Sequence, residues 1–114
     1  MPLRLLAAET LREKLFLNLH QELPYQLTVE TDNWNERDDG SADVHLSIYV
    51  AREGHRGIIL GKGGQTMRRI GTAARKELET ALARRIHLFA HVKYRKDWMN
   101  DSARYSIWDL DYNA

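Results

Sequence analysis

The chain has 114 residues, of which 43% are hydrophobic, it contains no cysteine, and its formal net charge is +1. This length suits one domain with a single core. The lack of cysteine excludes a disulfide framework and a thiolate metal site. No apolar run approaches the ~20 residues of a membrane helix, and no signal-peptide pattern is visible at the N-terminus. We therefore expect a cytoplasmic protein without a transmembrane segment.

The small net charge hides an uneven distribution. Residues 52–96 carry twelve basic and three acidic residues, whereas the segments on both sides are net acidic. A basic region of this kind is typical of proteins that bind a phosphate backbone. The alternative is a solvated, charge-rich helix surface. We favour the nucleic-acid interpretation because the basic region surrounds a glycine-rich turn.

The first half of the chain predicts a helix followed by a β-hairpin. Residues 3–22 have an apolar stripe at helical spacing, and Pro24 ends the helix. Residues 25–36 and 44–51 alternate with a period of two, which predicts two strands joined by a hairpin loop at 37–41. Trp34 is expected to have a structural role. The helical stripe comprises Ala7, Leu11, Leu15 and Leu19, widened by Leu6, Ala8 and Phe16.

The second half predicts two helices and a third strand. Residues 53–55 break the second strand, and a short helix spans about 56–60. A long helix runs from Gly64 to about Ala83, and residues 86–94 alternate as a strand. The predicted core stripe of this long helix is Met67, Ile70, Ala74, Leu78, Ala81 and Leu82.

These elements define the fold class, which is α+β with the order helix, strand, strand, helix, helix, strand. A strand–helix–helix–strand unit requires a right-handed crossover, which makes the second and third strands parallel. The three strands would form a mixed sheet with the helices on one face. The other face would be open and carry Tyr49 and Phe89. We assign residues 1–96 to this domain and expect residues 97–114 to pack on it as a tail.

The turn Gly61-Lys62-Gly63-Gly64, called the GKGG loop below, joins the two predicted helices. Glycine lets the backbone bend freely and leaves no side chain between it and a ligand. The following helix directs its N-terminal N–H groups and the positive end of its dipole at the loop, where a phosphate is favoured. Lys62 adds a mobile positive charge.

Enzyme chemistry finds little support in these residues. The nucleotide-binding loop of NTPases needs four residues between its glycines and a Ser or Thr after its lysine. Here three residues separate Gly57 from Gly61, and Gly63 follows Lys62. His87 and His91 are ~13 Å apart along one strand, too far to share a metal ion. We therefore expect neither catalysis nor a cofactor.

The chain resembles the KH family of RNA-binding domains. Leu60-Gly61-Lys62-Gly63-Gly64 followed by Met67 matches the I-G-x-x-G-x-x-I core of the KH fold, and the predicted element order is that of type II. A narrower resemblance is to the C-terminal domain of the bacterial Era GTPases. The segments that carry it are residues 22–25, 61–65, 70–79, 87–89 and 92–93, with Trp98. The sequence departs from that pattern at Ala90-His91 and after Asn100.

The resemblance implies single-stranded RNA binding, in particular of the 3′ end of 16S rRNA, and a role in small ribosomal subunit assembly. It also implies that GTP hydrolysis belongs to a separate N-terminal GTPase domain, and that the full-length protein can associate peripherally with the inner membrane. Phosphate contacts would come from basic residues around the loop, namely Arg52, Arg56, Arg68 and Arg69. The GKGG loop, Gly61 to Gly64, would hold the RNA backbone, and Ile58, Ile59 and Met67 would line an apolar groove. For these three side chains, core packing is an equally good interpretation.

A second function class is a protein-interaction module. The open sheet face with Tyr49 and Phe89, together with the aromatic tail, could dock the GTPase domain or a second copy of the chain. This interpretation is compatible with RNA binding.

Overall fold

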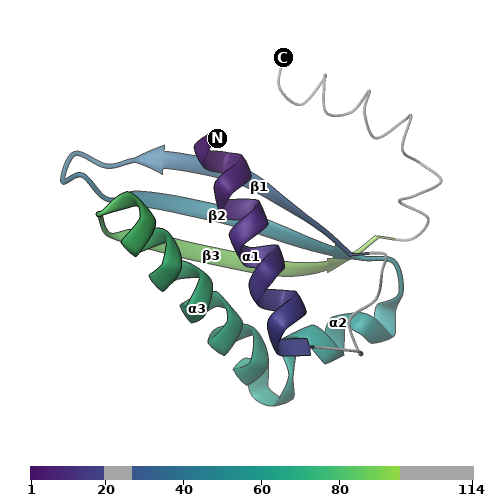
Figure 1. Ribbon diagram of the computed structural model, residues 1–114. Coiled ribbons are helices and arrows are strands. Elements are labelled where there is room, and N and C mark those ends of the chain that lie inside the picture. Colours follow the sequence, from purple (N-terminus) through teal and green to yellow (C-terminus); the bar gives the residue numbers. More distant parts are fainter. Residues whose placement is uncertain (20–26, 96–114) are drawn as a thin grey trace, which may run out of the picture.

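The computed structural model describes residues 1–19 and 27–95 and confirms the predicted order of elements (Figure 1). The elements are α1 (Leu3–Leu19), β1 (Leu27–Glu36), β2 (Ala42–Val50), α2 (Glu53–Leu60), the 3₁₀ turn η2 (Lys62–Gly64), α3 (Gln65–Leu82) and β3 (Ile86–Tyr94). The predicted tail packing and the predicted helix end at residues 20–22 lie outside the described residues.

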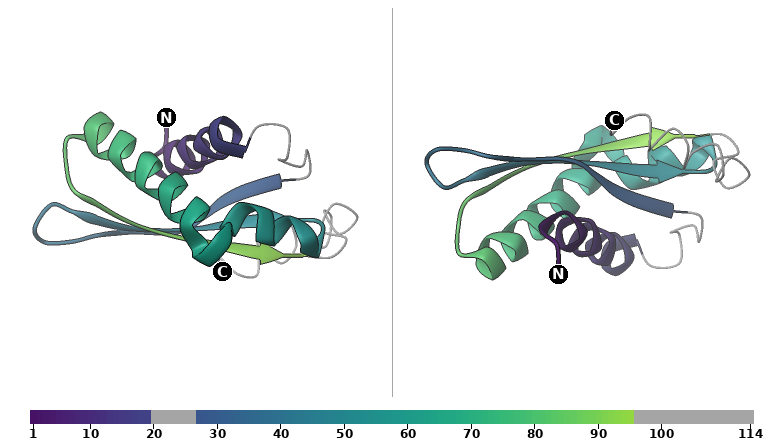
Figure 2. Two further views of the ribbon diagram at one scale, coloured as in Figure 1. Left: turned by 90° about the horizontal axis from the view of Figure 1, so that it is seen from below. Right: turned by 90° about the horizontal axis from the view of Figure 1, so that it is seen from above.

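The sheet has the predicted mixed topology. Its order is β1-β2-β3, with β1 antiparallel and β3 parallel to β2. The parallel register runs from Ala42 opposite Ile86 to Val50 opposite Tyr94. Figure 2 shows α1 and α3 together on one face of the sheet, while the other face carries no helix within the described part of the chain. β3 is therefore an edge strand of the described sheet.

The core lies between this sheet and the helices. The α1 stripe packs there as predicted, since Ala7, Leu11 and Leu15 are fully buried. The α3 stripe contributes four buried residues, and alternate residues of β2 complete the layer. These further core residues are Met67, Ile70, Ala74, Leu78, Val44, Leu46 and Ile48.

Three details of the helices differ from the expectation. α2 begins at Glu53 rather than near residue 56. Phe16 and Ala81 were placed on core stripes but are exposed. The Phe16 ring lies instead beneath the guanidinium of Arg12, 5.3 Å from its centroid.

A β-bulge at Asp32 interrupts the alternation of β1. The pairing with β2 shifts register between Thr31 and Asn33. Arg4 donates to the Asp32 carbonyl at 2.6 Å, and the Thr31 hydroxyl donates to the Arg4 carbonyl at 2.7 Å. These bonds attach the start of α1 to the bulge. The extra residue also brings Trp34 against the core, which confirms its structural role.

The face opposite the helices is only partly open. Phe89 is 44% exposed and stacks on His45, with ring centroids 4.7 Å apart. Tyr49 was expected to be open but is only 8% exposed, and the Arg95 guanidinium lies 4.3 Å from its ring centroid. The expectation was wrong for Tyr49 because period-two alternation gives the direction of a side chain but not what covers it.

Glu79 ties the end of α3 to the start of β3. Its carboxylate accepts the backbone N–H of Ile86 at 2.9 Å and a guanidinium N–H of Arg75 at 2.9 Å. The Ile86 N–H, followed by the positive charge of Arg75, lowers the pKa of Glu79 below its ordinary value. This joint connects the last turns of α3 to the first residue of β3.

The lowered pKa predicts a pH-dependent contribution to stability. At pH 7, Glu79→Gln should reduce the free energy of unfolding by about 1 kcal/mol, because the bonds to an ionised acceptor are lost. This contribution is fully present above the unfolded pKa of about 4.3 and disappears as pH falls through the lower folded pKa. Urea denaturation at pH 7, 5, 4 and 3 measures it. A difference that stays constant over this range would contradict the assignment.

Candidate nucleic-acid interface

The GKGG loop is a tight turn closed by its own backbone. The Gly61 N–H donates to the Gly57 carbonyl at 2.9 Å, and the Gly64 N–H donates to the Gly61 carbonyl at 3.1 Å. The Gln65 N–H donates to the Lys62 carbonyl. The N–H groups of Lys62 and Gly63, at the tip, lie outside these three bonds. The tip is therefore the part of the loop that can donate to an incoming phosphate.

Two glycines are required for different reasons. Gly61 has φ 72° and ψ 175°, a combination that is essentially restricted to glycine. A Cβ at this position would also overlap the Thr66 side chain. Gly63 has φ 61° and ψ 21°, and no atom lies within 4 Å of a Cβ placed there. Gly61 is therefore required by the conformation of the turn, whereas Gly63 leaves the tip of the turn without a side chain.

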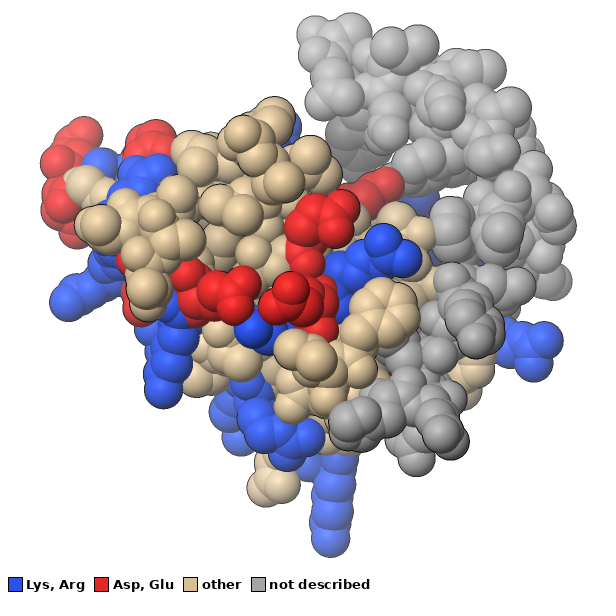
Figure 3. Space-filling view, in the orientation of Figure 1, with Lys and Arg blue, Asp and Glu red and all other residues tan. Residues whose placement is uncertain are grey.

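The basic residues near the loop differ in availability. Lys62, Arg68 and Arg69 are exposed, and within residues 1–19 and 27–95 none of them has an ion-pair partner. Arg56 is 3.3 Å from Glu53, which partly neutralises it. Figure 3 shows Lys and Arg side chains projecting along the lower edge of the molecule, where α3 begins in Figure 1, and acidic side chains across the middle of this face.

The three predicted apolar groove residues occupy different environments. Ile59 is fully buried in the core and offers no side-chain surface to a ligand. Ile58 is 36% exposed beside the loop. Met67 is 8% exposed and lines a surface depression between α3 and β3. Core packing was therefore the right interpretation for Ile59, and only Ile58 and Met67 present surface near the loop.

This depression, called the proximal groove, has a volume of about 380 Å³, and its lining begins at Met67 in the first turn of α3. One wall is the α3 face formed by residues three to four positions apart, and the other is the edge strand β3. Its lining residues are Met67, Arg68, Gly71, Thr72 and Arg75 from α3, and Leu88, Phe89, Ala90 and His91 from β3. An unpaired strand edge beside a cationic helix offers backbone groups to bases and guanidinium groups to phosphates.

Sequence reasoning missed the groove residues Thr72, Arg75, Ala90 and His91 as site candidates. Helical spacing from Arg68 could have identified Thr72 and Arg75, because residues at i+4 and i+7 share a face. For β3 the only sign was the unexpected Ala90-His91 pair. Which strand edge lies beside the loop depends on how the helices pack.

The described residues were also considered for a metal site and for a membrane-spanning helix. No three His, Asp or Glu side chains in residues 1–19 and 27–95 are placed to hold a metal ion. None of the helices in these ranges has both the length and the hydropathy needed to cross a membrane.

The two glycine environments predict unequal costs of substitution. Gly61→Ala should lower the free energy of unfolding by about 3 kcal/mol or more, because the backbone conformation is strained for alanine and the new methyl overlaps Thr66. Gly63→Ala should cost about 1 kcal/mol, since its left-handed conformation has free space around it. Urea denaturation measures both values. Equal costs would show that the turn is not constrained at Gly61.

The sequence and the fold are similar to those of known proteins. The KH domain family profile matches residues 22–99. GTPase Era of Dinoroseobacter shibae is 53% identical over 97% of this chain, and GTPase Era of Caulobacter vibrioides is 50% identical over 100% of this chain. The chain spans 36% of the length of each of these relatives.

Solved Era structures have the same fold. A crystal structure of Aquifex aeolicus Era bound to GDP and AlF4⁻ matches with a TM-score of 0.80 at 39% identity, covering 86% of this chain and 33% of that chain. A crystal structure of Era in complex with MgGDPNP and nucleotides 1506–1542 of 16S ribosomal RNA matches with a TM-score of 0.79 at the same identity and coverage. The chain belongs to the KH domain family, with a type II fold, and its whole length matches the C-terminal part of GTPase Era.

Proposed function

We propose that this chain binds single-stranded RNA through the GKGG loop, and that its target is the 3′ end of 16S rRNA during small ribosomal subunit biogenesis. It would act as the RNA-binding part of an Era-like GTPase, with residues 1–96 as the binding unit and residues 97–114 as its tail. GTP hydrolysis would belong to the part of the relatives that this chain does not match.

One observation carries the proposal. Three features occur together around the start of α3. They are a loop tip without side chains at its glycines, three exposed cations without ion pairs among the described residues, and the proximal groove. A loop of this kind in a KH domain clamps the backbone of about four nucleotides. The target comes from the similarity to Era, which has been crystallised with nucleotides 1506–1542 of 16S rRNA.

We propose the following roles for the residues of the site. The N–H groups of Lys62 and Gly63 would donate to phosphate oxygens, and Gly61 and Gly64 would maintain the turn. The aliphatic surface of Ile58 and Met67 would contact bases, while Ile59 supports it from the core. Phosphate contacts would come from Arg68 and Arg69, and from Arg52 and Arg56 in the N-terminal part of α2.

Protein docking through the open sheet face has weaker support. Tyr49 is buried, which leaves the Phe89 ring as the exposed large apolar group on the β2–β3 part of that face among the described residues. A patch of this size is below what protein interfaces normally use.

The proposal predicts a loop-dependent loss of binding. Lys62→Asp/Gly63→Asp should weaken binding of the 3′-terminal 16S rRNA sequence by on the order of 10- to 100-fold, because the Lys62 ammonium is lost and two carboxylates at the loop tip repel the phosphates. Asp tolerates the left-handed conformation of Gly63, so the variant should fold, which circular dichroism checks. Fluorescence anisotropy measures binding, with a scrambled RNA as the sequence control.

A matched variant separates local contacts from overall charge. Lys76→Asp/Thr80→Asp makes the same charge change at exposed positions on α3, and Lys76 lies about 18 Å along the helix from the loop. It should bind nearly as well as wild type.

Binding should also depend on salt. If about four phosphates are neutralised, the slope of log K against log salt should be about −3. Equal losses in both variants, or binding that salt does not change, would contradict the loop mechanism.

A further inference from the structure

The sheet has two edges, and β1 forms the edge that lies away from the proximal groove. Among the described strands, β1 pairs with β2 alone. Every second residue of an edge strand directs its backbone N–H and C=O groups away from its neighbour, where another strand can bind them. Figures 1 and 2 show the hairpin end of β1 projecting past α1, with no other part of the described chain along its outer edge.

The bulge divides this edge into two parts. At Asp32 the backbone carbonyl already accepts a hydrogen bond from Arg4, which attaches this point of the strand to α1. Between the bulge and the hairpin lie residues 33–36, called the β1 edge segment below. Within the described ranges, these four residues form no backbone hydrogen bond outside their pairing with β2. Their outward backbone groups are therefore available to a further strand.

The residue types around the β1 edge segment are unusual for a strand. Asp32, Asn33 and Asn35 are exposed, and Asn and Asp are depleted in strands. Their strand conformation is thus maintained by the pairing with β2. Such short polar side chains leave the backbone of an edge accessible, and the two amide groups can donate and accept hydrogen bonds.

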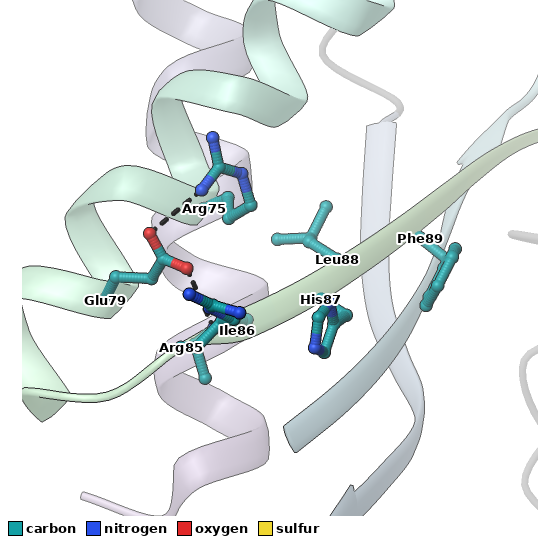
Figure 4. A pocket seen from close by; sticks show the side chains of 7 residues that line it. All are labelled: Arg75, Glu79, Arg85, Ile86, His87, Leu88 and Phe89. Carbon is teal, nitrogen blue, oxygen red and sulfur yellow. Dashed lines mark hydrogen bonds and ion pairs between the residues drawn. The ribbon is translucent and has the colours of Figure 1, made fainter. Parts of the chain in front are cut away.

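The two edges of the sheet differ in charge. Arg75 and Arg85 lie beside β3 (Figure 4). Residues 27–41, which include most of β1 and the hairpin loop, contain five acidic residues and one basic residue. Figure 3 shows acidic side chains gathered at the hairpin end of the molecule. The β1 edge segment therefore lies in a negative potential.

The negative charge at the hairpin is not neutralised within the described residues. Arg37, the basic residue of this region, is 2.8 Å from Asp43 and is paired with it. Asp38 and Asp39 are exposed and form no ion pair in residues 1–19 and 27–95. The Ser41 hydroxyl and N–H donate to Asp39 and lower its pKa, which keeps this carboxylate ionised at neutral pH.

Charge decides which partner fits this edge. A second copy of the chain would bring another acidic β1 edge, and RNA would bring phosphates, so both would be repelled. An extended polypeptide rich in lysine or arginine would be attracted. It could also pair its backbone with the edge, as in β-strand addition.

We propose that the β1 edge segment docks an extended, lysine- or arginine-rich segment of another protein. The docked segment would add a fourth strand to the sheet, and its cationic side chains would lie near Asp32, Asp38 and Asp39. This surface is separate from the GKGG loop and from the open sheet face, so its occupation does not require RNA at the loop.

A set of peptides tests this inference. The probe has eight residues, with lysine at alternate positions and valine or threonine between them, and spans about 26 Å when extended. NMR titration of the ¹⁵N-labelled 114-residue chain should show shifts at the amides of Asn33 and Asn35, together with slower hydrogen exchange there. A peptide with proline at its two central valine or threonine positions keeps the charge but loses two N–H donors. It should bind about tenfold more weakly.

Two charge-reversal variants test the acidic contribution. Asp38→Lys should weaken binding of the lysine peptide by about fivefold, because an attraction becomes a repulsion. Glu9→Lys is the matched control, since it makes the same charge change at an exposed position on α1. It should bind the peptide as wild type does. Circular dichroism checks that both variants are folded.

Four outcomes would overturn the proposal. Equal binding of the lysine and proline peptides would mean a general attraction of charge without an added strand. Equal effects of the two variants, or no shift at residues 33–36, would exclude the β1 edge segment as the site. Dimerisation of the chain through this edge, measured by sedimentation and abolished by the peptide, would show that a second copy is the natural occupant.

Discussion

The parallel pairing of β3 with β2 is the constraint on which the candidate site depends. A parallel partner cannot follow through a tight hairpin, so the chain crosses over through α2, the GKGG loop and α3 before it returns as β3. The return places the helix that follows the loop beside an unpaired strand edge. Glu79 then fixes the joint by binding both Arg75 and the first N–H of β3. The loop, the helix face and the strand edge therefore belong to one topological unit.

The basic residues of this chain fall into two groups, those that form ion pairs between elements and those that do not. Lys14, Arg37 and Arg84 pair with Glu77, Asp43 and Glu36, and so connect neighbouring elements. The cations around the loop tip form no such pairs among the described residues. Charged groups kept in water without a protein partner add little to stability, so their presence around the loop is explained better by a ligand than by the fold.

Much of the fold could be predicted because it follows from local periodicity. The stripe of α1, the alternation of β3 and the crossover rule depend on the order of apolar residues alone. The bulge at Asp32 and the burial of Tyr49 could not be predicted, since both involve residues far away in the chain, Arg4 at the bulge and Arg95 over the Tyr49 ring. The loop was visible as a motif, whereas the groove residues Arg75 and His91 meet only when α3 packs beside β3.

In the proposed complex, RNA contacts the loop tip and the edge of β3 beside the proximal groove. Amide chemical-shift changes in the ¹⁵N-labelled chain, on titration with RNA from the 3′ end of 16S rRNA, test this most directly. The structure predicts the largest changes at Lys62 and Gly63, followed by residues of β3 such as His91. Changes confined to α1, with the loop amides unmoved, would contradict it.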